Sequence, residues 1–229
     1  GVIRHTNPLF PIILLIATVA GCLYLSRSGI HDPAAIFQTL FGGKPLQNFL
    51  LQSLFVMTFI VLQLALTDHL VYCIDNFDYL SVRYGNQSEW LKALITGALI
   101  LTAAFVVLVY VIGLLFCLVT MEIKITQAIN LHAVGVIARV YLFCAIAALT
   151  QICLLMKYTK SSVFTIMSGI AIFLALTNRF QDSVFYILPR SGSTMTVGLD
   201  VLKSIVLAIA LIALIQRTIL KRELPPHEN

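Results

Sequence analysis

Six long apolar runs separated by polar segments constrain this 229-residue chain more than any other feature. Each run is close to the ~20 residues that a helix needs to cross the hydrocarbon of a bilayer. The runs cover residues 9–25, 49–72, 91–119, 133–156, 162–177 and 199–216. We therefore predict an all-α, polytopic membrane bundle of six transmembrane helices, with residues 1–229 forming a single transmembrane domain.

The composition excludes a soluble domain. Hydrophobic residues make up 59% of the chain and charged residues only 11%, whereas about a quarter of a soluble domain is charged. The net charge of +5 fits anchoring of helix ends at the cytoplasmic surface better than nucleic-acid binding. The five cysteines lie in or beside apolar runs without a CxxC pair, so we expect buried thiols rather than disulfides or metal ligands.

The polar stretch 73–92, between the second and third runs, predicts an ordered element. Phe77, Leu80 and Tyr84 recur at three- and four-residue spacing, which places them on one face of a helix. We predict a short amphipathic helix on the cytoplasmic membrane surface. An ordinary connecting loop is the alternative.

A sharp turn into the third span should follow this helix. Gly85 can end the helix in a left-handed cap. Asn86 with Glu89 has the spacing of a capping box that opens the next helix. Trp90 and Lys92 are expected where the third span leaves the headgroup region.

Two other polar segments and the basic residues bear on topology. Residues 33–41 predict a short surface helix, and residues 178–198 form a sizeable polar segment before the last span. Lys157 and Lys160 bound a tight turn between the fourth and fifth runs, and the C-terminal tail is also basic. Because short cytoplasmic connections carry the excess of Lys and Arg, we predict that both termini are cytoplasmic.

Ionisable residues within the runs lie near their ends. Asp68, His69, Arg139, Asp200 and Lys203 are all within about two helical turns of a predicted boundary. We expect snorkelling or local pairing, with Asp200 and Lys203 paired at i and i+3. No charge falls at the middle of a run, which argues against an ion-coupled secondary transporter.

The deeper polar residues are Gln63 and Gln151. An amide within a span is best satisfied by a neighbouring helix. We therefore expect these two residues to form interhelical hydrogen bonds rather than ligand contacts.

The chain lacks the motifs of ATP hydrolysis. Gly42-Gly43-Lys44 is the only hint of a phosphate-binding loop, but Pro45 follows it and the earlier glycine is missing. One enzymatic alternative remains, in which Asp68, Asp75 and Asp78 hold a divalent metal and a diphosphate at the membrane edge. That alternative is a metal-dependent membrane enzyme of lipid synthesis.

With six spans, a polar amphipathic segment after the second span and no ATPase motif, the chain resembles the permease subunits of type-2 ABC exporters. The resemblance implies that residues 75–89 form a coupling helix seated in a cleft of the ATP-binding subunit, with residues 83–86 as its turn. It also implies that residues 157–160 lie near that subunit and that residues 178–198 dip into the outer leaflet. The contact residues that it implies are Asp75, Phe77, Asp78, Leu80, Arg83, Tyr84, Gly85, Asn86, Glu89, Lys157 and Lys160.

The same resemblance implies a function and partners. The chain would export a peptide, a drug or another amphipathic substrate from a bacterial cell, or protect the cell against antimicrobial peptides. It would not be an enzyme, since ATP and Mg²⁺ would bind a separate soluble ATPase. It would pair with a second copy or a related permease in the plasma membrane. A non-transporting immunity or sensor protein is a further alternative.

Overall fold

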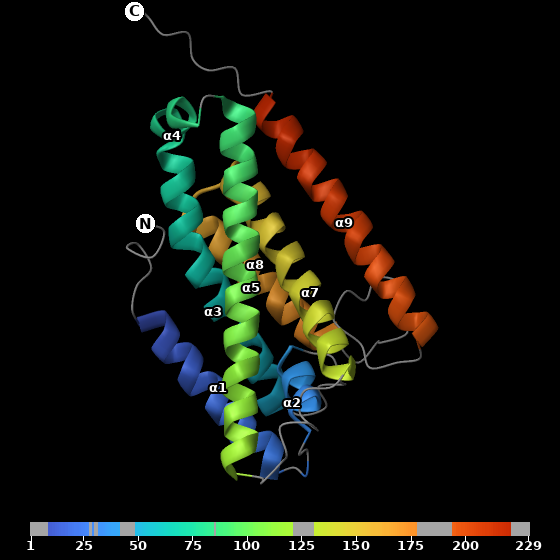
Figure 1. The fold of residues 1–229 in the computed structure, drawn as a ribbon. Helices are drawn as coiled ribbons and strands as arrows, with labels where there is room; N and C mark the ends of the chain where they lie inside the picture. The colour runs from blue at the N-terminus through green and yellow to red at the C-terminus, as the bar shows by residue number, and fades with distance from the viewer. Residues whose placement is uncertain are drawn as a thin grey trace, which may run out of the picture.

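The computed structural model describes residues 9–27, 29, 32–41, 49–84, 86–120, 131–177 and 194–220. The elements in these ranges are helices (Figure 1), and none is a strand. They are α1 (Leu9–Arg27), α2 (Pro33–Leu40), α3 (Phe49–Asp75), α4 (Phe77–Arg83), α5 (Gln87–Thr120), α7 (Leu131–Leu155), α8 (Lys160–Thr177) and α9 (Thr194–Leu220). The predicted all-α class is therefore confirmed for the described residues.

Each of the six apolar runs lies on a helix: α1, α3, α5, α7, α8 or α9. Four of these, α3, α5, α7 and α9, are long and apolar enough to cross a membrane. The described apolar stretches of α1 and α8 are shorter, at Leu15–Arg27 and Lys160–Leu176. The four long helices indicate a membrane protein, while the full set of six spans stays a prediction.

Successive long helices run in alternating directions, which gives the bundle two distinct ends (Figure 1). At one end lie α4, the turn between α7 and α8, and the C-terminal end of α9. We call it the α4 end. At the other, the α2 end, lie α2, the end of α5 and the start of α7.

The core forms around α3 and α7. α3 contacts α1, α2, α5, α7 and α8, whereas α9 packs mainly on α7 at the edge of the bundle. Three aromatic rings meet between α3 and α7, with centroids 5.8–6.4 Å apart. They belong to Phe55 and Phe59 on α3 and to Phe143 on α7. This spacing is within the range favoured by aromatic pairs, so the cluster joins the two central helices.

Buried hydroxyls in these helices are satisfied locally. Thr58 donates to the carbonyl of Leu54 at 2.9 Å, and Thr102 donates to that of Ala98 at 2.8 Å. Such bonds to the carbonyl four residues earlier let threonine occupy an apolar environment without an unpaired group.

The helix expected on the surface at residues 33–41 is instead packed inside the α2 end, so that prediction is wrong. Asp32 caps α2 by accepting from Ala34 N at 3.3 Å and Ala35 N at 3.1 Å. Every residue of α2 except Ala35 is buried. The polar Gln38 and Thr39 are buried together with the apolar residues, because α3, α5 and α7 pack around this helix.

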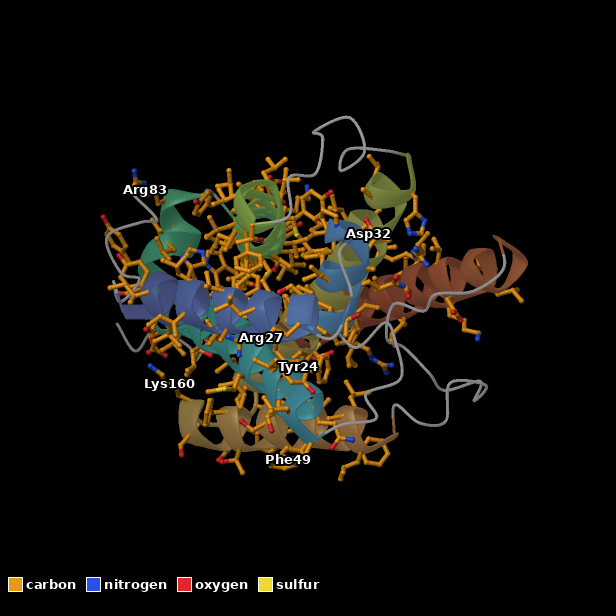
Figure 2. All side chains as sticks on the ribbon, turned by 90° about the horizontal axis from the view of Figure 1, so that it is seen from below. Tyr24, Arg27, Asp32, Phe49, Arg83 and Lys160 are labelled. Carbon is orange, nitrogen blue, oxygen red and sulfur yellow. The ribbon has the colours of Figure 1, made fainter. Side chains whose placement is uncertain are left out.

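The ring of Phe37 fixes α2 in this position. It meets Tyr110 of α5 edge to face, with centroids 5.3 Å apart, and Phe41 at 5.1 Å. Figure 2 views this end of the molecule and shows Asp32 beside α2, between α1 and α7. Among the described residues, α2 therefore belongs to the packed interior of this end.

Removal of the Phe37 ring tests the packing of α2. Phe37→Ala leaves a cavity at a side chain that is 2% exposed, and we expect a loss of about 3 kcal/mol of stability. Phe49→Ala is the matched control, because Phe49 is 83% exposed and its truncation creates no cavity. The measurement is the thermal unfolding midpoint in mild detergent. Equal shifts for the two variants would contradict the buried position of α2.

Candidate functional site

The break between α3 and α4 is a single residue, Asn76. Its side-chain Nδ2 donates to the carbonyl of Tyr72 at 2.8 Å, and its backbone N–H donates to the same carbonyl at 3.2 Å. The Asn76 carbonyl then accepts from Leu80 N at 2.9 Å, which begins the hydrogen bonding of α4. The chain thus changes direction at one residue, and no flexible loop separates the two helices.

Asn86 opens α5 on the other side of α4. Its Oδ1 accepts from Glu89 N at 2.8 Å, and its carbonyl accepts from Trp90 N at 3.2 Å. This confirms the predicted N-cap. The carboxylate of Glu89 meets Lys92 Nζ at 2.6 Å. The predicted Gly85 cap lies outside the described residues.

An aromatic pair fastens α4 to α5. The rings of Phe77 and Trp90 meet edge to face, with centroids 4.6 Å apart and planes at 80°. Trp90 is buried, while its predicted position at the level of the headgroups stays a prediction. Its ring lies under α4 because an aromatic contact within the protein is available there.

The face of α4 that carries Phe77, Leu80 and Tyr84 is only partly covered by the core. Phe77 and Leu80 pack against the core, as their spacing predicts. Tyr84, the residue that follows the last turn of α4, is 48% exposed. α4 contacts the end of α3 and the start of α5, and this support does not extend to its last residues.

An ion pair shows how far α4 stands from the rest of the bundle. Lys160, the first residue of α8, meets Asp68 of α3 at 2.6 Å. From Asp68, α3 continues to Asp75, which is about 10 Å at 1.5 Å per residue. α4 thus sits on a projection formed by α3 and α5, beyond the turn between α7 and α8 (Figure 1).

α5 also extends beyond the bundle, alongside the end of α3. A Cβ built on Gly97 would lie 3.5 Å from His69 Nε2, so Gly97 of α5 is level with His69 of α3. α5 starts at Gln87, about 15 Å further along the helix axis. We call the end of α3 from Asp68, α4 and the start of α5 to Gly97 the stalk.

The outer surface of α4 exposes apolar side chains. Tyr79 is 68% exposed and Val82 is 82% exposed, and Arg83 is exposed between Val82 and Tyr84. Figure 2 shows Arg83 pointing away from the helices. We call Tyr79, Val82, Arg83 and Tyr84 the α4 surface. An apolar surface rimmed by polar residues is typical of a site that binds a protein or a membrane.

Sequence reasoning missed Tyr79 and Val82. Their signal was present, since they are apolar residues on the face opposite Phe77 and Leu80, where a surface helix should be polar. At the same end of the bundle, the turn between α7 and α8 exposes Lys157 and Tyr158. Basic and apolar groups therefore share this end of the bundle.

The remaining site residues lie at the same end. Asp75 is exposed at the end of α3. Asp78 lies on α4, but its side chain is outside the described set. Lys160 is engaged by Asp68, and a partly exposed pair of this kind contributes at most about 1 kcal/mol.

The arrangement gives the metal-binding alternative no support among the described residues. Asp68 is directed to Lys160, and Asp75 lies two turns further along α3. Within the described ranges, no group of three or more His, Cys, Asp or Glu side chains is placed to hold a metal ion.

The predicted interhelical role of the two deep amides is confirmed for Gln151. Its Nε2 on α7 donates to the Gln63 carbonyl of α3 at 3.1 Å and also to Thr67 Oγ1. Thr67 Oγ1 in turn donates to the Gln63 carbonyl at 2.6 Å. These bonds join the two central helices in an apolar environment, where hydrogen bonds are poorly replaced by solvent.

Charged residues near the α2 end form local contacts. Lys203 Nζ lies 3.4 Å from Asp200 Oδ1, which confirms the predicted pair on α9. Arg139 donates from Nε to the Gly135 carbonyl of its own helix at 3.2 Å. The five cysteines lie on described helices as free thiols. Three of them are buried as expected, whereas Cys73 and Cys153 are half-buried.

The chain matches no protein-family model, no curated protein and no solved structure. The features that bear on function are therefore the stalk, the α4 surface and the contact between α3 and α7.

Loss of the Trp90 ring should release α4 from the stalk. In Trp90→Ala we expect amide hydrogen exchange of residues 77–84 to accelerate at least tenfold, because the anchor of Phe77 is gone. The rest of α3 and α5 should stay protected. Tyr79→Ala removes an exposed ring from the same helix and serves as the control. Unchanged exchange in Trp90→Ala would show that the aromatic pair does not hold α4.

Proposed function

We propose that this chain is the transmembrane permease subunit of an ATP-driven ABC exporter, and that it moves a peptide, drug or other amphipathic substrate. One observation carries the proposal: a short helix is firmly attached to the end of a stalk, and its outer surface exposes apolar and basic side chains. In this proposal the α4 surface binds a soluble ATPase subunit.

The attachment of α4 supports a mechanical role. Asn76 joins α4 to α3 directly, and the Phe77–Trp90 contact joins it to α5. A displacement imposed on α4 would therefore move the ends of α3 and α5 together. α3 contacts α1, α7 and α8 within the bundle, so motion of the stalk would reach the helices around it.

ATP hydrolysis belongs to the partner in this proposal, because the sequence offers no phosphate-binding loop. Closure of two ATPase subunits on ATP and Mg²⁺ would pull the two α4 helices of a permease pair. The turn with Lys157 and Tyr158 provides a second contact at the same end. The substrate path would run between the two permease copies.

The distribution of basic residues supports a cytoplasmic α4 end. Over the whole sequence the predicted inner and outer sides carry nearly equal numbers of Lys and Arg, eight and seven. The inner residues, however, occupy the shorter connections, and the tight turn between α7 and α8 carries both Lys157 and Lys160. Because the density of Lys and Arg near span ends sets topology, this orientation places α4 in the compartment that contains ATP.

Two equally exposed valines test the proposed ATPase contact. Val82 on α4 is 82% exposed, and Val119 at the α2 end of α5 is 81% exposed. We expect Val82→Glu to reduce copurification of a soluble ATPase in mild detergent by at least tenfold, because it places a charge in the apolar contact. Val119→Glu should leave copurification unchanged. Equal recovery from both variants would contradict an ATPase contact on the α4 surface.

The orientation is tested with a membrane-impermeant maleimide. A cysteine introduced as Tyr79→Cys should react only after the cells are permeabilised, whereas Val119→Cys should react in intact cells. The unsubstituted chain gives the background from the native cysteines. Labelling of the residue 79 variant in intact cells would place α4 outside and would end the proposal.

A further inference from the structure

The polar contact between α3 and α7 leaves several amide atoms unused. The side chains of Gln63 and Gln151 are 2% and 1% exposed. Gln151 uses its Nε2 for both bonds to α3, while its Oε1 has no hydrogen-bond partner. Neither Oε1 nor Nε2 of Gln63 has a partner. Three buried amide atoms on two touching helices are thus unpaired.

A single rearrangement would satisfy all three atoms. Two side-chain amides can pair reciprocally, with each Nε2 donating to the other Oε1. Such a pair between Gln63 and Gln151 uses the three unpaired atoms together with Gln151 Nε2. It releases the Gln63 carbonyl and Thr67 Oγ1, but these two groups already bond each other at 2.6 Å.

We propose that α3 and α7 exchange between two hydrogen-bonded arrangements. In the first, seen in this structure, Gln151 binds the Gln63 carbonyl and the Thr67 hydroxyl. In the second, α3 turns about its axis so that the side-chain amides of Gln63 and Gln151 pair. Each arrangement keeps a hydrogen bond between the helices. The second also pairs the amide atoms that have no partner in the first.

The position of these residues gives the exchange a consequence at the α4 end. Asp68 and the stalk follow Thr67 directly on α3, so rotation of α3 at Gln63 displaces α4 relative to the turn between α7 and α8. The inference concerns the chain alone and does not depend on an ATPase partner. Its failure would therefore leave the proposed function untouched.

Thermal unfolding in detergent distinguishes the roles of the two amides. Gln151→Leu removes the bonds of both arrangements, and we expect its midpoint to fall by at least about 2 °C. Gln63→Leu removes only unpaired atoms in the arrangement seen here, so its midpoint should be unchanged or raised. If Gln63→Leu lowers the midpoint as much as Gln151→Leu does, the Gln63 amide is already bonded, for instance to a buried water, and the proposal is wrong.

Spin labels test the motion itself. The labels are attached to cysteines introduced at two exposed positions, as Tyr79→Cys on α4 and Tyr158→Cys in the turn between α7 and α8. The half-buried Cys73 and Cys153 are replaced by alanine so that they do not take up label. Electron–electron distance measurements on the full chain should give two populations. Gln63→Leu should retain only one of them, because the second arrangement needs its amide.

Thr58→Val is the matched control for this measurement. It removes a buried hydroxyl from α3 whose only recorded bond is within that helix, so both populations should persist. A single distance that is the same in the unsubstituted chain, Gln63→Leu and Thr58→Val would overturn the proposal.

Discussion

The contact between α3 and α7 joins two central helices of the bundle through both ring packing and hydrogen bonds. In a bilayer the lipid tails are as apolar as the helix surfaces, so the hydrophobic effect does not by itself bring spans together. Close packing and hydrogen bonds must decide the arrangement. The Phe55, Phe59 and Phe143 rings supply the first, and Gln151 supplies the second.

The two ends of the bundle are built differently. At the α2 end, a capped helix of apolar residues fills the space between α3, α5 and α7. At the α4 end, α3 and α5 extend beyond the turn between α7 and α8 and carry a short helix with an exposed outer surface. Among the described residues, this asymmetry is what supports the proposed binding of a soluble partner at the α4 end.

α3 links the proposed function to the proposed exchange. It carries α4 at one end, and at its middle it carries the Gln63 and Thr67 groups bound by Gln151. A helix that transmits displacement must be able to take more than one position against its neighbours. Unpaired amide atoms at its polar contact with α7 favour such freedom, since the hydrogen bonds seen here leave these atoms unsatisfied.

The sequence determined the features that arise within one helix. Runs of about 20 apolar residues must be helical in a bilayer, because only a helix satisfies their backbone groups internally. The Asn86 cap and the Asp200–Lys203 pair were predictable for a related reason, as their partners are three residues apart. The exposed apolar residues of α4 were also readable from the spacing.

Only the tertiary structure decided the contacts between residues distant in the sequence. The burial of α2, the pairing of Asp68 with Lys160 and the approach of Gln151 to Gln63 each depend on which helices are neighbours. The position of Trp90 under Phe77 depends likewise on how α4 folds back over α5. Apolar periodicity cannot supply this information, because in lipid many faces of a helix are apolar whether they meet protein or hydrocarbon.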